Sequence, residues 1–196
     1  MSRYVVYFVS IVIMSALWGC GNQGDPGNGN TVYMQASLTP NTTGVATANV
    51  FSNMSGSPFA NMTTVASANM LSFTINSKIY PNANKIPVSD IIIDSISFTY
   101  TPQEYAPGKL SPSFVPTLSK LSYSGNLPAG GSLKIDNVPI LWNNDLISIR
   151  NYVNANNIPT GTALQYKVGV TFHGIEVNTS TALSNSINVG AVVSVQ

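Results

Sequence analysis

The chain has 196 residues and is close to neutral, with eight basic residues, seven acidic residues and one histidine. This balance excludes a surface that attracts nucleic acid, and a single histidine excludes metal sites built on several imidazoles. Charged residues make up 8% of the chain, where about 25% is usual. The solvated surface must therefore be built largely from the abundant Asn, Ser and Thr, as is common in exported β-proteins.

The first residues have the pattern of a secretion signal. Arg3 supplies a positive charge, and an apolar run follows over residues 4–17. A run of this length falls within the ~7–15 residues of a signal-peptide core and short of the ~20 that cross a bilayer as a helix. We therefore expect residues 1–19 to be a signal peptide that is removed.

The apolar run ends in Leu17-Trp18-Gly19-Cys20. This tetrapeptide resembles the lipobox of bacterial lipoproteins, although Trp18 stands where a small or β-branched residue is usual. The resemblance implies that Cys20 is lipidated and becomes the first residue of the mature protein. Acyl chains contribute about 0.8 kcal/mol per buried methylene, so we expect firm attachment in the bacterial cell envelope, at the periplasmic or outward face of the outer membrane. A secreted protein without lipid and an uncleaved N-terminal anchor are the alternatives.

Residues 20–30 follow the signal and contain Gly, Asn, Asp and Pro but no apolar residue after Cys20. Such a segment cannot bury enough surface to offset the entropy of ordering it. We predict that it is a flexible tether. Residues 31–196 are long enough for one sizeable domain with its own core.

From Thr31 onward, apolar and polar residues alternate in short runs separated by Pro, Gly and Asn, which indicates β-strands. The inner-face positions that this alternation predicts in the first three clear runs are Val32, Met34, Ala36 and Leu38, then Leu71, Phe73 and Ile75, then Ile96, Phe98 and Tyr100. One-sided strands pack as antiparallel sheets around a shared core. We therefore predict an all-β fold, an antiparallel β-sandwich.

Two segments echo each other: residues 45–52 read VATANVFS and residues 65–72 read VASANMLS. Two copies are too few for a repeat array, so we predict two similar strands, on a hairpin or in two sheets, with chance similarity as the alternative. Residues 102–116 hold four prolines and predict an extended loop, because proline cannot donate to a β-ladder. Strands are expected at residues 118–123 and 133–141, with a Gly-containing turn at 127–132.

One short helix is predicted over residues 144–153. Leu146, Ile149 and Val153 fall at helical spacing, and an Asn-Asn pair at 156–157 can end the helix. We expect Asn143 or Asn144 to cap its N-terminus, because a side-chain oxygen there can accept from a free backbone N–H.

The clearest alternation lies in residues 166–173, where Tyr166, Val168, Val170 and Phe172 predict one inner face. His173 has the opposite parity and should lie on the outer surface. Apolar residues resume at Ile175 and Val177, one position out of step, so we predict a bulge at Gly174.

The order of short helix, Gly161-Thr162, Tyr166-x-Val168-x-Val170, polar turn and a final strand over residues 187–195 resembles the C-terminal half of fibronectin type III and other immunoglobulin-like sandwiches. The resemblance covers about forty residues. It implies an immunoglobulin-like sandwich in which Tyr166 stands near the start of the penultimate strand.

Candidate catalytic groups are few. His173 could serve as a base, but the sequence contains no Gly-x-Ser-x-Gly motif that would supply a serine nucleophile. The two glutamates, Glu104 and Glu176, are far apart in the sequence and do not by themselves predict the paired carboxylates of a glycosidase. Asp136 and residues 143–145 offer oxygen ligands but not the spacing of a calcium loop. We therefore predict no catalytic residue, no metal and no cofactor.

These patterns predict a non-catalytic, lipid-anchored envelope protein whose β-sandwich presents a binding or structural surface to a protein or glycan partner. A small envelope hydrolase that uses His173 or the two glutamates is one alternative. Another is an accessory carbohydrate-binding module, which would need an exposed aromatic side chain. Trp142 is the only tryptophan beyond the signal and follows apolar residues, so we expect it in the core or at its edge.

Overall fold

The computed structural model of the chain describes residues 31–40, 42–50, 65–81, 87–103 and 114–196. The predicted signal peptide and tether, residues 1–30, lie outside this range, and so does Cys20. In the described part, strands dominate and one helix is present. The prediction of an all-β, sandwich-like fold with a single short helix before the penultimate strand is confirmed.

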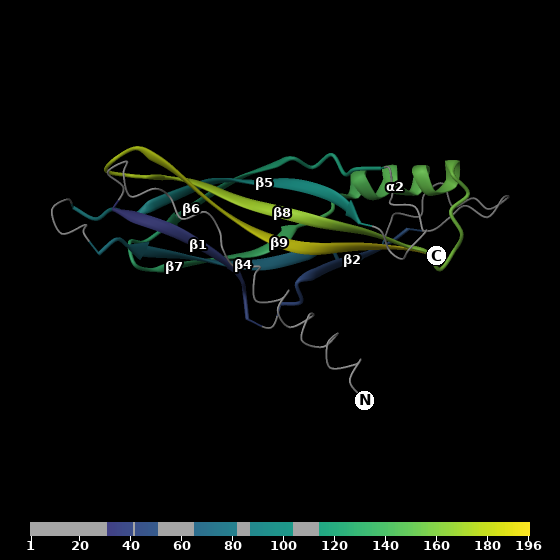
Figure 1. Ribbon diagram of the computed structural model, residues 1–196, viewed down its shortest axis with the longest axis horizontal. Helices are drawn as coiled ribbons and strands as arrows, with labels where there is room; N and C mark the ends of the chain where they lie inside the picture. The colour runs from purple at the N-terminus through teal and green to yellow at the C-terminus, as the bar shows by residue number, and fades with distance from the viewer. Residues whose placement is uncertain (1–30, 41, 51–64, 82–86, 104–113) are drawn as a thin grey trace, which may run out of the picture.

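The strands form a six-stranded sheet in the order β3-β2-β9-β8-β5-β6 and a three-stranded sheet in the order β1-β4-β7. The elements are β1 (Val32–Leu38), β2 (Val45–Val50), β3 (Val65–Ala68), β4 (Met70–Ile79), β5 (Ile91–Gln103), β6 (Lys120–Leu127), β7 (Ser132–Pro139), α2 (Asn143–Ala155), β8 (Ala163–Glu176) and β9 (Thr181–Val195). Figure 1 shows β5, β8 and β9 running along the length of the molecule, with α2 at one end.

The core lies between the two sheets. Phe73 of β4 and Phe172 of β8 meet edge to face, with ring centroids 5.2 Å apart, and both side chains are fully buried. The predicted inner faces of β4, β5 and β8 are all buried: Leu71, Phe73, Ile75, Ile96, Phe98, Tyr100, Tyr166, Val168, Val170 and Phe172. Full burial of a large apolar side chain contributes about 1.5–3 kcal/mol, so these alternating residues are what holds the sheets face to face.

The helix α2 closes the core at the end where β8 begins. It buries Leu146, Ile149 and Val153, as the helical spacing predicts, and packs against β2. Its C-cap residue is Asn156, in the Asn-Asn pair predicted to end it. The predicted cap is wrong, because the helix starts earlier than expected: Trp142 is the N-cap residue and makes no side-chain capping bond.

The six-stranded sheet is mixed rather than purely antiparallel. β2 pairs with β9 in parallel, from Val45 opposite Gly190 to Val50 opposite Val195, while the other pairs in this sheet are antiparallel. An alternating run buries the same residues whichever way it points, so the sequence pattern could not fix the direction of β2. The first echoing segment contributes β2, and the second contributes β3 and the first residues of β4 in the other sheet. β2 and β3 pair with each other.

Several predicted boundaries shift. β5 extends into the predicted proline-rich loop, and Pro102 pairs with Tyr166 of β8. The pairing of β5 with β6 stops at Ser97, so on that side Pro102 faces no described strand and its missing N–H costs no ladder bond. The predicted turn at 127–132 is confirmed: it joins β6 to β7, and the Gly131 N–H donates to the carbonyl of Pro128 at 2.9 Å.

The predicted bulge at Gly174 is wrong in its position. β8 pairs with β9 without interruption along its whole length, and the irregularity lies on β5, where Asp94 is the extra residue opposite Gly174 and His173. A Cβ at Gly174 would stand 2.8 Å from the carbonyl oxygen of Ile92. Glycine is therefore needed there because a neighbouring bulged strand approaches closely.

Because β8 stays in step, its last residues have the reverse of the predicted parity. Ile175 is 43% exposed, whereas Glu176 is fully buried. The Glu176 carboxylate accepts hydrogen bonds from the backbone N–H of Thr31 (3.3 Å) and the hydroxyls of Thr31, Ser89 (3.4 Å) and Thr179 (3.1 Å). Neutral donors thus stabilise this buried carboxylate, and no ion pair with it occurs in the part of the chain that the structure describes.

A second polar side chain of the same hairpin binds β1. Asn185 of β9 is buried, and its Oδ1 accepts the backbone N–H of Ala36 at 2.8 Å. Thr31 directly precedes β1, and Ala36 lies near its other end. The side chains of Glu176 and Asn185, both from the large sheet, therefore bind the free edge of the small sheet at two points. This arrangement satisfies backbone groups that an edge strand would otherwise leave unpaired.

We expect Glu176→Ala to lower the free energy of unfolding by about 2 kcal/mol or more, because buried donors lose a charged acceptor. The matched control is its neighbour Ile175→Ala, which should change stability by less than about 0.5 kcal/mol since that side chain is exposed. Urea unfolding of both variants measures the difference. A large loss in Ile175→Ala with little loss in Glu176→Ala would restore the parity predicted from the sequence and contradict the structure.

Candidate functional site

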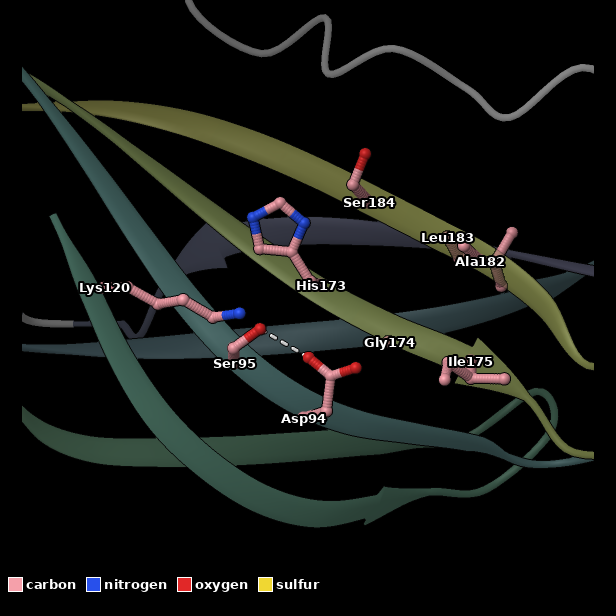
Figure 2. A pocket seen from close by; sticks show the side chains of 9 residues that line it. All are labelled: Asp94, Ser95, Lys120, His173, Gly174, Ile175, Ala182, Leu183 and Ser184. Atoms are coloured by element: carbon pink, nitrogen blue, oxygen red, sulfur yellow. Dashed lines mark hydrogen bonds between the residues drawn. The ribbon is translucent and has the colours of Figure 1, made fainter.

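Two surface hollows contain the residues that the sequence singled out. The first, of about 370 Å³, lies on the outer face of the six-stranded sheet around the bulge of β5 (Figure 2). Its lining residues are Asp94, Ser95, Lys120, His173, Gly174, Ile175, Ala182, Leu183 and Ser184. It is shallow because its floor is the sheet itself.

His173 lies on the outer face, as its parity predicts, and is partly buried. Its Nε2 is 2.7 Å from Oγ of Ser97 on the adjacent strand β5. In Figure 2 the imidazole extends away from Asp94, whose carboxylate accepts the hydroxyl of Ser95. The histidine therefore has a serine partner, but within the described residues no hydrogen bond joins it to a carboxylate that could orient the ring as in a catalytic triad.

The structure does not bring a pair of catalytic acids together in its described part. Glu176 is fully buried beneath Thr31 and cannot reach a substrate, while Glu104 lies outside the described residues. Among those residues there is also no cluster of three or more His, Cys, Asp or Glu side chains suited to a metal ion. Asp136 instead pairs with Lys134 at 2.9 Å.

The second hollow, of about 240 Å³, lies where the loop before β6 meets the start of α2. It is lined by Thr117, Leu118, Ser119, Lys120, Trp142, Asn144 and Asp145, and we call it the Trp142 hollow. Trp142 is 44% exposed, so the predicted burial of its side chain is wrong. The two preceding residues, Ile140 and Leu141, are fully buried and take the core positions, and the chain then turns outward into the helix.

Asp145 holds the wall of the Trp142 hollow together. The residue is 1% exposed, and its Oδ1 accepts both the backbone N–H and the hydroxyl of Thr117, at 2.7 and 2.8 Å. Its position in the first turn of α2 favours negative charge. The other oxygen, Oδ2, is buried and has no hydrogen-bond partner among the described residues, which is unusual for a carboxylate.

Two buried tyrosines lie near this aspartate. The hydroxyl of Tyr100 donates to the carbonyl of Ile140 at 2.7 Å, whereas that of Tyr166 has no partner within the described residues. Burial raises the pKa of both tyrosines above the usual value, and the charge of Asp145 raises it further. Tyr166 does stand near the start of the penultimate strand, where the immunoglobulin-like resemblance places a tyrosine, but without the backbone hydrogen bond that such a tyrosine makes.

The chain was compared with protein-family models, with curated proteins and with solved structures, and none of them matches it. The function must therefore be argued from the site. Sequence reasoning missed most of the Trp142 hollow, because its polar residues come from two segments that are separated by β6 and β7 and carry no periodic signal. The one available signal was a tryptophan directly before a predicted helix start.

No helix of the described residues is both long and apolar enough to cross a bilayer. The single helix there, α2, has 13 residues and carries polar side chains over much of its surface.

We expect Tyr166→Phe to leave the free energy of unfolding unchanged or to raise it, since the hydroxyl that it removes is buried without a partner. The control, Tyr100→Phe, removes a formed hydrogen bond and should cost about 1 kcal/mol. Thermal or urea unfolding compares the two. A larger loss in Tyr166→Phe would show that its hydroxyl is bonded after all.

The same two tyrosines set the direction of the alkaline pH dependence. Their pKa in the folded state is raised, so above about pH 10 the unfolded chain loses protons that the folded protein keeps. Stability is therefore full below that pH and falls as the pH rises further. Each Phe variant should show a shallower fall than the wild type in unfolding experiments between neutral and strongly alkaline pH.

Proposed function

We propose that this chain is a non-catalytic binding protein of the bacterial cell envelope, attached to the outer membrane by lipid on Cys20. The lipobox-like Leu17-Trp18-Gly19-Cys20 and the apolar run before it support the anchor. The near-neutral charge argues against nucleic acid as the partner. A protein or a glycan of the envelope remains as the partner class.

One observation carries the binding part of the proposal: the chain enters the domain at one end of β8, away from the Trp142 hollow. Thr31 is bound to Glu176 at the end of β8, whereas α2 lies where β8 begins (Figure 1). β8 has 14 residues, which at about 3.3 Å per residue separates its ends by roughly 40 Å. The Trp142 hollow lies between these ends, because Lys120 in its lining pairs with Ser97 of β5, which pairs with Thr171 near the middle of β8. A membrane anchor ahead of Thr31 therefore leaves the hollow away from the point where the chain enters the domain.

A second candidate, a small envelope hydrolase, has one observation in its favour. A serine hydroxyl in contact with a histidine, as in Ser97 and His173, is the first requirement of a serine nucleophile. The pair lies between neighbouring strands on an open sheet face. On that face Thr171 and Ser186 make a similar hydroxyl contact at 2.7 Å, so cross-strand pairing of polar side chains accounts for Ser97 and His173 without catalysis.

We expect Cys20→Ser to release the protein from membranes while the domain keeps its fold, because lipid would be attached at that sulfur and Cys20 precedes the domain. Membrane and soluble fractions of cells that express the wild type, Cys20→Ser and the neighbouring control Asn22→Ser measure the distribution. Circular dichroism of the purified proteins checks the fold. If Cys20→Ser stays in the membrane fraction as fully as Asn22→Ser does, the lipid anchor is wrong.

We also expect that a fluorophosphonate probe, which labels activated serines, leaves Ser97 unmodified. The reason is that His173 has no orienting carboxylate in the described structure, so the serine is not made nucleophilic. Mass spectrometry of the treated protein gives the answer. Labelling of Ser97 that disappears in His173→Ala would contradict the non-catalytic proposal and favour the hydrolase.

A further inference from the structure

We propose that the Trp142 hollow binds one neutral sugar ring of an envelope glycan. This inference deepens the proposed binding function and rests on it. Three observations carry it: an exposed indole, a polar lining with balanced charge, and a volume suited to a single ring.

The indole of Trp142 is the first element of the site. At 44% exposure it presents a large apolar surface to solvent, directly beside the hollow. The face of an indole is electron-rich, and the C–H groups on one side of a pyranose ring form a matching apolar patch. Stacking of the two would bury both surfaces and leave the sugar hydroxyls pointing sideways to the polar wall.

That polar wall has the donors and acceptors that hydroxyl groups need. Thr117 and Ser119 supply hydroxyls and Asn144 supplies an amide, each able to donate and accept. Of the described residues that line the hollow, Lys120 brings the one positive charge and Asp145 the one negative charge. A balanced lining of this kind does not select a phosphate, which would call for several cations.

Asp145 fixes one wall of the hollow in place. Its Oδ1 is held by Thr117 at 2.7 and 2.8 Å, so the carboxylate cannot rotate freely, and Oδ2 has no partner among the described residues. Because Thr117 is held in this way, the wall of the hollow would require little ordering on binding.

The size of the hollow limits the ligand. Its volume of about 240 Å³ falls slightly below the ~300–1,000 Å³ typical of pockets for drug-sized molecules. One sugar ring suits this space, and the neighbouring rings of a chain would extend over the exposed side chains around it. We therefore expect weak binding of monosaccharides and stronger binding of oligosaccharides.

The test uses the full-length protein, purified in a detergent without a sugar headgroup. The chain has two tryptophans, so a Trp18→Phe background makes Trp142 the sole tryptophan, excited selectively over tyrosine, whether or not the signal is cleaved. The probes are soluble tetrasaccharides of glucose, mannose, galactose and N-acetylglucosamine. We expect at least one of them to change the fluorescence of Trp142 in a saturable manner.

Calorimetry with that tetrasaccharide then compares variants. Trp142→Ala should weaken binding about tenfold or more, and Asn144→Ala should weaken it to a smaller extent while the reporter is kept. The matched control is Val177→Ala, which removes a similarly exposed apolar side chain (50%) just after β8. This variant should bind the tetrasaccharide with the affinity of the wild type.

Two results would overturn the proposal: no tetrasaccharide changes the fluorescence of Trp142, or Trp142→Ala binds as tightly as Val177→Ala does. Neither result depends on lipid at Cys20, because the measurements are made in detergent. Failure of the anchor would show only in the membrane fractionation of Cys20→Ser, so the two failures can be told apart.

Discussion

The structure depends on one buried carboxylate, that of Glu176. A carboxylate removed from water is costly unless enough donors surround it, and here the donors are a backbone N–H and hydroxyls of neighbouring loops and of Thr31. Their convergence fixes three parts of the chain at one point: the start of β1, the segment before β5 and the turn after β8. The edge of the small sheet is thereby joined to the end of the large one. Asn185 repeats this connection further along β1.

The alternation of residues predicted most of the sandwich because burial imposes the same period on every one-sided strand. It failed at the end of β8, where Ile175 and Val177 are apolar but exposed and Glu176 is acidic but buried. Two physical causes account for this. The extra residue sits on β5, which the pattern of β8 cannot show, and the donors that make a buried glutamate tolerable come from Thr31 and Ser89, both far away in the sequence.

The helix illustrates both the strength and the limit of the same reasoning. The buried residues of α2 follow from helical spacing. The residue at which the helix begins does not, because it depends on how the preceding residues are packed. Ile140 and Leu141 are held in the core, so the first helical residue falls at Asn143 and Trp142 is left at the surface. The exposure of that tryptophan, on which the proposed sugar site depends, is thus a consequence of packing at its neighbours.

The position of Thr31 also determines how the domain would respond to force. If the protein is anchored ahead of Thr31 and a ligand is held at the Trp142 hollow, level with the middle of β8, tension acts largely along the axis of β1. The seven residue pairs between β1 and β4 have hydrogen bonds perpendicular to that axis, so they would be sheared together rather than opened one after another. A glycan pulled away from the membrane would therefore load the domain in the direction in which the pairing of β1 with β4 resists force best.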